Sequence, residues 1–353
     1  MHLFVDISSH GFGHLAIAAP VLNALGRRLP ELRLTIRTLL PEAQLHQRIA
    51  LPFTHIGQAS DFGFVMHDAI HVDREKSAAA YRLAHADWPA SVATEAAFLK
   101  QLSPDLVLSN VSYLPLAGAA RAGLPAAALC SLNWADIFQH HFADEDWAAP
   151  IHRQMLDAYR CARAFLRITP GMPMPDLDNL VPVGVVVQAG QKHPLGLLTD
   201  MRVVLVGMGG IEMRLPLENW PRLPGVRWLV PDEWQCRHPD ALPQSASRLS
   251  FTDLLASVDA VLSKPGYGTF SEAVASGTPV LYQRRQGWPE EDCLIEWLHA
   301  HGRAREIDAD TLMTGDLQGP LTELLALPAQ PPLVADGADE AAKRLLNLLR
   351  PLP

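Results

Sequence analysis

The sequence Leu262-Ser263-Lys264-Pro265-Gly266-Tyr267-Gly268-Thr269-Phe270-Ser271-Glu272-Ala273 contains a glycine-rich turn between two contrasting patterns. The apolar run 259–262 before it predicts a buried strand. The helical spacing of Phe270 and Ala273 after it predicts a helix, which we expect to end at Gly277. Backbone amides at a helix N-terminus are open to an anion, so this turn is a candidate phosphate or diphosphate site.

A second glycine turn, near the N-terminus, has the same construction. The strand pattern of residues 3–7 runs into His10-Gly11-Phe12-Gly13-His14, and leucines at helical spacing follow as far as Pro30. Further strand and helix patterns alternate up to residue 130, which predicts a parallel sheet with helices on both faces. Ligands of such sheets bind at the carboxyl ends of the strands, where the second glycine turn lies.

Proline interrupts this alternation after residue 168. The run Thr169-Pro170-Gly171-Met172-Pro173-Met174-Pro175 can form neither a helix nor a central strand, because proline fixes φ and lacks an N–H donor. A strand pattern and the turn Gly207-Met208-Gly209-Gly210 then start a second alternating region. We therefore predict four segments: a Rossmann-like domain over 1–168, a connection over 169–196, a second Rossmann-like domain over 197–335, and a C-terminal helix over 336–353 that could dock on either domain.

Composition restricts the class of protein. The 353 residues are 48 % apolar and 19 % charged, which suits two packed domains, and the formal net charge of −9 argues against a nucleic-acid partner. Four dispersed cysteines lack any Cys-x-x-Cys spacing, which favours reduced thiols in the cytoplasm over a disulfide framework or a zinc site. Neither a signal peptide nor a transmembrane segment is expected, since no apolar run approaches the roughly 20 residues that span a bilayer.

Two parallel-sheet domains whose glycine turns face each other across a cleft form the α/β GT-B architecture of nucleotide-sugar glycosyltransferases. The turn at Gly13-His14 and the segment from Gly266 to Glu272 resemble the GT-B enzymes grouped with MurG, the N-acetylglucosaminyltransferase of peptidoglycan synthesis. A closer resemblance is to the glycosyltransferase-like N-terminal domain of plant L-arabinokinases. The motifs that carry this closer resemblance are His10–His14, Asn133–Asp136, Gly171–Pro175, Lys264–Thr269, Arg284-Arg285 and Glu290-Glu291.

The resemblance implies an inverting, metal-independent transfer of a sugar from a nucleotide-diphosphate sugar to a hydroxyl acceptor, with a UDP-sugar as the expected donor and no cofactor. Nothing in the sequence resembles the glycine- and serine-rich phosphate loop of the plant kinase half, so sugar kinase activity is not expected. Two alternatives stay open: a nucleotide-sugar-binding module without catalysis, and a GT-B epimerase acting on a UDP-sugar. The acceptor is not identified, and both a lipid-linked acceptor and peripheral membrane association are compatible with the sequence.

The resemblance places the donor mainly on the second domain. The diphosphate is expected on the turn at Gly266, and the ribose hydroxyls are expected on Glu272. A competing interpretation is that Glu272 closes a capping box with Thr269, which would need no ligand. The full set of expected donor-binding residues is Gly13, Gly209, Gly210, Gly266, Tyr267, Gly268, Thr269, Glu272, Arg285, Glu291 and Asp292.

Three of these residues lie in the loop 283–292, which follows another predicted strand. Arg284 or Arg285 could offset the charge of a diphosphate. An acidic side chain of this loop is expected to bind hydroxyls of the donor sugar, and the pattern does not fix the register between Glu291 and Asp292. Acids at the start of a helix also complement the helix dipole without any ligand, so that interpretation carries equal weight.

His14 is the expected catalytic base. A helix N-terminus disfavours the imidazolium, so the ring is predicted to stay neutral and able to accept a proton near pH 7. The competing interpretation is a structural histidine bonded to a backbone carbonyl, and His10 is a weaker candidate base. Asp136 could orient His14 or act as the base itself, although an aspartate that merely starts a helix explains it equally well. Trp134 and Phe138 fit either a sugar-stacking wall or the core.

No metal site is expected from the sequence. The Asp-x-Asp patterns at 176–178 and 308–310 do not follow sheet strands, where a donor would bind, and the pair His140-His141 lacks the spacing of metal ligands. Amides and the helix dipole could stabilise a leaving diphosphate in place of a cation.

Overall fold

The computed structural model describes residues 1–196 and 201–349. The first four residues of the predicted second domain, 197–200, and the last four of the predicted terminal helix, 350–353, lie outside the described residues. None of the helices in the described part of the chain is long and apolar enough to cross a membrane.

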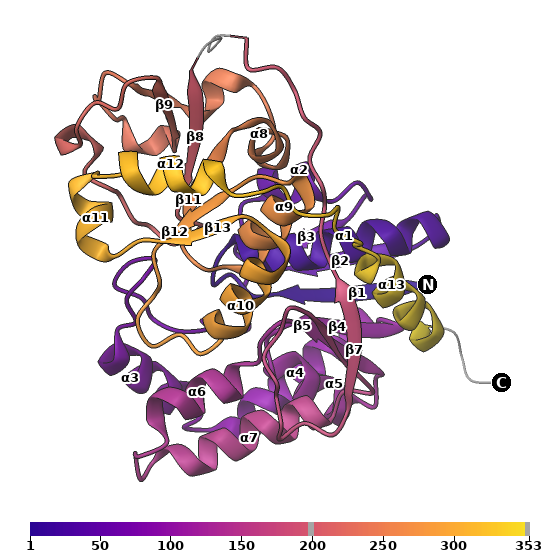
Figure 1. The fold of residues 1–353 in the computed structure, drawn as a ribbon. Helices are drawn as coiled ribbons and strands as arrows, with labels where there is room; N and C mark the ends of the chain where they lie inside the picture. Colours follow the sequence, from indigo (N-terminus) through magenta and orange to yellow (C-terminus); the bar gives the residue numbers. More distant parts are fainter. Residues whose placement is uncertain (197–200, 350–353) are drawn as a thin grey trace.

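Two separate parallel sheets form the framework of the molecule (Figure 1). The first sheet has seven strands in the order β3-β2-β1-β4-β5-β6-β7, and its strand pairings are parallel. The strands are β1 (His2–Ile7), β2 (Arg33–Arg37), β3 (Thr54–Ile56), β4 (Leu106–Asn110), β5 (Ala126–Cys130), β6 (Phe165–Thr169) and β7 (Leu180–Val185). The central strands β1, β4 and β5 are buried along their whole length, as expected for strands covered by helices on both faces.

Seven helices are interleaved with the first sheet. They are α1 (Phe12–Arg28), α2 (Glu42–Arg48), α3 (Arg74–Ala84), α4 (Trp88–Leu102), α5 (Leu114–Ala122), α6 (Trp134–Phe142) and α7 (Ala148–Arg160). The longest, α1, starts directly after the N-terminal glycine turn and buries its leucine face, as the leucine spacing predicts.

The second sheet has six parallel strands in the order β10-β9-β8-β11-β12-β13. Its strands are β8 (Arg202–Gly207), β9 (Val226–Val230), β10 (Ala241–Pro243), β11 (Ala260–Ser263), β12 (Val280–Tyr282) and β13 (Ala304–Glu306). Its α-helices are α8 (Phe251–Ser257), α9 (Tyr267–Ser276), α10 (Glu291–His301), α11 (Ala309–Thr314) and α12 (Gln318–Ala326). The predicted pair of α/β parallel-sheet domains is therefore confirmed.

Strand β7 extends the first sheet into the segment predicted as the connection. Residues 170–179 contain neither helix nor strand, as their prolines predict, but Leu180–Val185 pairs with β6. Pro182 is accommodated because β7 is the edge strand, where a missing N–H donor breaks no second ladder. The chain thus leaves the first sheet at Val185, later than the sequence suggests.

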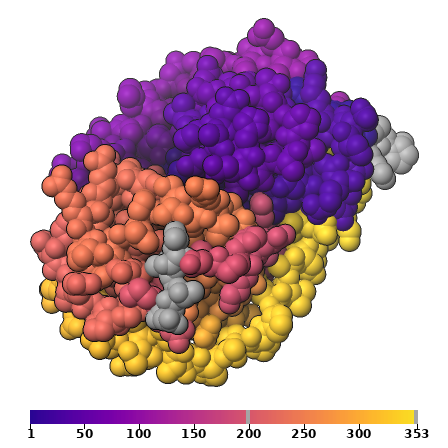
Figure 2. Space-filling model, turned by 90° about the horizontal axis from the view of Figure 1, so that it is seen from above, coloured from indigo at the N-terminus to yellow at the C-terminus, as the bar shows by residue number. Residues whose placement is uncertain are grey.

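The C-terminal helix α13 (Gly337–Leu349) returns to the first sheet and packs against α1 and β7. Arg28 donates a hydrogen bond of 2.7 Å to Asp339, and the amide of Gly184 donates one of 2.8 Å to Glu340. Figure 2 shows the yellow C-terminal segment passing along the second domain to reach the first domain, which is coloured indigo there. The docking side that the sequence left open is therefore the first domain.

Helices α1 and α9 bring the two predicted glycine turns together. A Cβ built on Gly268 would lie 2.8 Å from the Cβ of Ala16, so the two helix starts touch without room for another methyl group. The hydroxyl of Tyr267 donates to the carbonyl of Thr169 at 3.0 Å and accepts from the amide of Val186 at 2.9 Å. These contacts hold the second domain against the end of the first sheet.

Candidate active site

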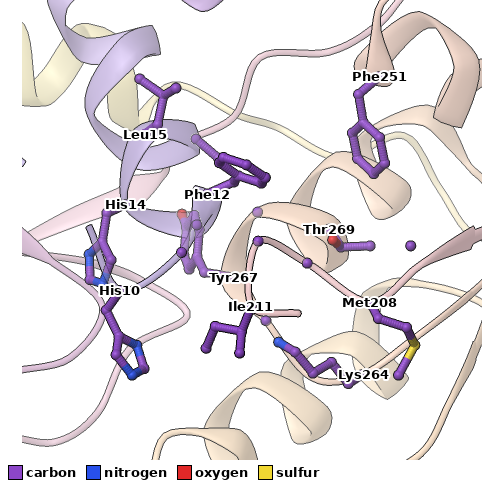
Figure 3. A pocket seen from close by; sticks show the side chains of 18 of the residues that line it. His10, Phe12, His14, Leu15, Met208, Ile211, Phe251, Lys264, Tyr267 and Thr269 are labelled. Carbon is purple, nitrogen blue, oxygen red and sulfur yellow. The ribbon is translucent and has the colours of Figure 1, made fainter. Parts of the chain in front are cut away.

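A cavity of about 350 Å³ lies between the two domains, at the carboxyl ends of strands from both sheets. Both glycine turns line it, together with the loops that follow β5, β8, β9 and β12. Figure 3 shows the rings of His10 and His14 on one side of the cavity, and Lys264 and Thr269 on the other. This is the edge of the sheets at which ligands of parallel α/β domains bind.

The turn after β11 presents a helix N-terminus to the cavity. Gly266 is the N-cap of α9, and Gly277, with a φ of 71°, ends the helix in the left-handed conformation that the sequence predicts. Residues 266–269 all line the cavity. The first amides of α9 have no partners within the helix, so they are available to an anion.

Two cationic side chains lie beside this turn. Lys264 is only 7 % exposed, and its Nζ lies 3.4 Å from a Cβ built on Gly209 and 3.9 Å from one built on Gly266. Burial and the charge of Arg285 hold the pKa of Lys264 well below its usual value. Arg285 itself donates a hydrogen bond of 2.8 Å to the carbonyl of Pro265. An anion bound here would raise the pKa of Lys264 and favour its charged form.

The glycine turn after β8 faces the start of α1. Gly209 has a φ of 90°, which strains any side chain. A Cβ built on Gly210 would lie 2.8 Å from Cδ2 of Phe12 and 3.0 Å from its backbone nitrogen. Close approach between the domains therefore accounts for the glycine at position 210. The neighbouring side chains of Met208 and Ile211 line the cavity and are apolar.

Glu272 faces the first domain and does not close a capping box. Thr269 is the third residue of α9, and the Glu272 carboxylate accepts hydrogen bonds from the guanidinium of Arg48 at the end of α2. The Glu272 side chain is 3 % exposed, and the Arg48 side chain is 17 % exposed. Burial raises the pKa of Glu272, and the charge and hydrogen bond of Arg48 oppose that rise.

His14 lies in the first turn of α1 and is held by Asn110, the last residue of β4. Its Nδ1 is 2.8 Å from Oδ1 of the asparagine. With that oxygen as acceptor, Nδ1 carries the proton and Nε2 is the basic nitrogen. Burial lowers the pKa of His14 to about 4, so the ring is neutral at pH 7. The hydrogen-bond partner of His14 is therefore the side-chain amide of Asn110. The competing interpretation of His14 as a structural histidine had expected a backbone carbonyl.

Asp136 does not reach the cavity. It lies in the first turn of α6, where its amide donates a hydrogen bond of 2.8 Å to the capping side chain of Asn133. Burial, with the nearby charge of Asp176, raises its pKa. The orienting position beside His14 is filled by Asn110, so the geometry around Asp136 is that of a residue at a helix start.

In the loop after β12, Glu290 is the carboxylate that lines the cavity. Its Oε1 accepts a hydrogen bond of 2.6 Å from the hydroxyl of Ser131 in the first domain, and its Oε2 accepts one of 3.2 Å from Nε1 of Trp288. Glu291 instead accepts from a backbone amide of the same loop at 2.9 Å. Asp292 pairs with an exposed arginine at 2.9 Å. The structure therefore brings neither Glu291 nor Asp292 into the cavity.

Aromatic rings close the cavity on the His10 side. The imidazole of His10 stacks on Trp288, with ring centroids 5.4 Å apart and planes at 3°, and it meets the edge of Trp134 at 5.1 Å. Trp134 and Phe138 have no exposed surface and belong to the core, so neither forms an open stacking wall. Trp288 is the indole that lines the cavity.

Three residues that line the cavity, and Asn110, which holds His14, were given no individual role by the sequence. Lys264 lies inside the glycine motif, and Glu290 stands one position before the acids that were chosen. Asn110 could have been identified from the sequence, because a polar side chain that ends an apolar strand faces the ligand-binding edge of the sheet. Arg48 could not have been identified from a local pattern, since its partner, Glu272, lies 224 positions away in the other domain.

Neither metal ligands nor disulfides are found at this site. Across residues 1–196 and 201–349, no three His, Cys, Asp or Glu side chains gather closely enough to hold a metal ion. All the cysteines are free. Cys130 lines the cavity, and burial raises the pKa of its thiol to about 12, so it stays protonated.

Comparison with known proteins agrees with the architecture. No protein-family model matches the sequence. L-arabinokinase of Arabidopsis thaliana is 27 % identical over 331 residues, which cover 88 % of this chain and 30 % of that protein. The chain therefore spans less than a third of the length of this curated relative.

Solved structures of glycosyltransferases have the same fold. The glycotransferase of kitacinnamycin superposes with a TM-score of 0.61 at 17 % identity, covering 99 % of this chain and 94 % of that chain. The glycosyltransferase VinC, solved in complex with dTDP, gives 0.57 at 18 % identity and covers 99 % and 95 %. A UDP-N-acetylglucosamine 2-epimerase gives 0.55 at 12 % identity and covers 98 % and 96 %. The fold of this chain is GT-B.

Proposed function

We propose that this chain is a glycosyltransferase, akin to the MurG-like group, that moves a sugar from a nucleotide-diphosphate sugar to a hydroxyl acceptor. A UDP-sugar is the donor that we favour. One observation carries the proposal: a single interdomain cavity combines a helix N-terminus flanked by buried cations with a neutral histidine. The helix N-terminus and cations suit a diphosphate, and the histidine suits an acceptor hydroxyl.

The donor is proposed to lie mainly on the second domain. Its diphosphate would bind the amides of residues 266–269, with Lys264 and Arg285 offsetting its charge. The ribose hydroxyls would bind Glu272. The carboxylate of Glu290, which lines the cavity beside Ser131, would accept hydrogen bonds from hydroxyls of the sugar.

In the proposed step, the acceptor hydroxyl gives its proton to Nε2 of His14 while its oxygen bonds to the anomeric carbon of the donor sugar. The bond from that carbon to the diphosphate oxygen breaks on the opposite face, so the configuration inverts and the nucleoside diphosphate leaves. Helix amides and the two cations stabilise the charge that grows on the leaving group. We therefore propose that the transfer is metal-independent.

The proposal extends to the organisation of the chain. We assign the acceptor to the first domain, whose sheet includes β7, and the donor to the second domain. Helix α13, residues 337–349, is the segment that returns to the first domain. Dispersed free cysteines favour a cytoplasmic location. The acceptor stays unidentified, and a lipid-linked acceptor with peripheral membrane association is compatible with this scheme.

Two other functions have an observation in their favour. The fold similarity to a UDP-N-acetylglucosamine 2-epimerase favours an epimerase. The match to only 30 % of a plant L-arabinokinase favours a binding module that serves a larger protein. Both alternatives share the donor site and differ from a transferase in what happens to the donor.

Following the donor by NMR separates the three functions. UDP- and dTDP-sugars that raise the melting temperature would be incubated with the chain, with water as the only acceptor. A transferase is expected to release the nucleoside diphosphate slowly with a sugar of inverted anomeric configuration, and His14→Ala is expected to abolish that release. A new sugar nucleotide without release would identify an epimerase. Bound donors that never react would contradict the proposal and favour the binding module.

A further inference from the structure

An ion pair between the two domains covers the proposed ribose ligand. Arg48 ends α2 in the first domain, and its NH1 donates to Oε1 of Glu272 on α9, while its NH2 lies 3.5 Å from Oε2. The Glu272 side chain is 3 % exposed, so the guanidinium is the principal polar group that its carboxylate meets. A ribose hydroxyl could reach this carboxylate fully only after the arginine moves.

The domains also touch on the same side of the cavity. Gly268 and Ala16 leave no space for a methyl group between α9 and α1, and Gly210 lies equally close to Phe12. Helix α2 packs against α1, so the Arg48 side chain and the α1 start belong to one wall of the cleft. Moving this wall away from α9 would separate Arg48 from Glu272.

We propose that Arg48 is an interdomain latch, which binds Glu272 in place of the ribose in the donor-free chain and which the donor nucleotide must displace. This inference rests on the proposed function, because it takes Glu272 as the ribose ligand. The exchange keeps the carboxylate satisfied at each stage, first by a guanidinium and then by two hydroxyls. An unpaired carboxylate buried in the closed cleft would be strongly destabilising.

The latch has a measurable consequence for affinity. A nucleotide that enters only the open form binds with an apparent Kd equal to its intrinsic Kd divided by the open fraction. Removing Arg48 leaves Glu272 uncompensated in the closed form but hydrated in the open form, so the open fraction rises. We therefore expect Arg48→Ala to bind UDP about threefold more tightly, or better.

The test compares Arg48→Ala and the similarly long Arg48→Gln with wild type. Arg214→Ala serves as the matched control, because Arg214 forms an ion pair with Glu218 inside the second domain. Small-angle X-ray scattering without nucleotide would give the radius of gyration, and calorimetry would give the Kd of UDP and of dTDP. Both Arg48 variants are expected to expand and to bind more tightly, whereas the control stays unchanged. In a Glu272→Gln background, Arg48→Ala is expected to cause no further expansion.

The outcomes separate the latch from the proposed function. Weaker nucleotide binding by both Arg48 variants would overturn the latch, since it would show that the arginine contacts the nucleotide itself. Unchanged size and affinity would overturn it as well, while nucleotide binding by wild type would leave the proposed function standing. If no form of the chain binds a nucleotide, the proposed function fails, and the latch, which rests on it, fails as well.

Discussion

His14 and Asn110 are joined side chain to side chain, Nδ1 to Oδ1 at 2.8 Å, although 96 positions separate them in the sequence. His14 lies in the first turn of α1, which follows the first strand of the sheet, and Asn110 ends the neighbouring strand β4. The bond fixes the tautomer of the ring and leaves Nε2 as the basic nitrogen. This pair is the reason that we assign general-base catalysis to His14.

Replacing His14 with alanine is expected to lower the transfer rate by about 10²- to 10⁴-fold, the usual contribution of a general base. Nucleotide affinity should stay within about threefold of wild type, because the proposed base acts on the acceptor and not on the nucleotide. Asn110→Leu removes only the orienting bond, so a loss of about tenfold in rate is expected. Steady-state kinetics and calorimetry on the same preparations give both quantities. A collapse of nucleotide affinity in His14→Ala would assign the ring to the donor.

The pH dependence of the rate reports the state of His14. Burial lowers its pKa to about 4, and the neutral ring is the active form. Activity should therefore be complete at neutral pH and be lost only as the pH falls through about 4. Asn110→Asp places a negative charge beside Nδ1, which raises the pKa of the ring and moves the acid limb to higher pH. If the acid limb of the pH–rate profile stays at the same pH in Asn110→Asp, the assignment of His14 as the catalytic base is contradicted.

Lys264 is expected to take up a proton when a nucleoside diphosphate binds. Burial and Arg285 hold its pKa well below the usual value, and a bound anion would raise it. Calorimetry of UDP binding at mildly alkaline pH, in buffers of different ionisation enthalpy, measures this uptake. Lys264→Met should abolish the uptake and weaken UDP binding by about 10- to 100-fold, the value of a charged hydrogen bond. Lys100→Ala, an exposed lysine of α4, is the control. Equal UDP affinity in Lys264→Met and wild type would exclude a diphosphate contact.

The contact between Gly268 and Ala16 tests whether the closed cleft matters for the reaction. A Cβ on Gly268 would lie 2.8 Å from the Cβ of Ala16, so Gly268→Ala holds the two helix starts apart. Transfer should fall by about 10²-fold, the effect of misplacing reacting groups by an ångström. Ala16→Gly in the same chain removes the clash and should restore most of the rate. A rate that falls and is not rescued would point to damage within α9 itself.

Local patterns predicted the glycine turns well, because each depends on residues close together in sequence. Strand β11, the turn at Gly266 and the stop at Gly277 all follow from apolar spacing and glycine chemistry. Strand β7 was included in the predicted connection, because the proline-rich run at 169–175 marked the end of the alternating pattern. The edge position that accommodates Pro182 becomes visible only in the assembled sheet.

The cavity contacts were harder to predict, because they depend on how the two domains meet. Glu290 reaches the cavity through hydrogen bonds to Ser131 in the other domain and to Trp288, and neither is visible in the spacing of the acids. The pairing of Arg48 with Glu272 likewise exists only when the domains are in contact. Asn110 was the exception, since a polar residue at a strand end could have been recognised.

A crystal structure with UDP bound tests the central claim most directly, namely that the turn at residues 266–269 is the donor site. We expect phosphate oxygens within about 3 Å of the first amides of α9, near Lys264, and both ribose hydroxyls on Glu272. Arg48 should then have left the carboxylate. UDP bound elsewhere on the chain, or no bound UDP at about 10 mM, well above the Kd of an ordinary nucleotide site, would contradict the account.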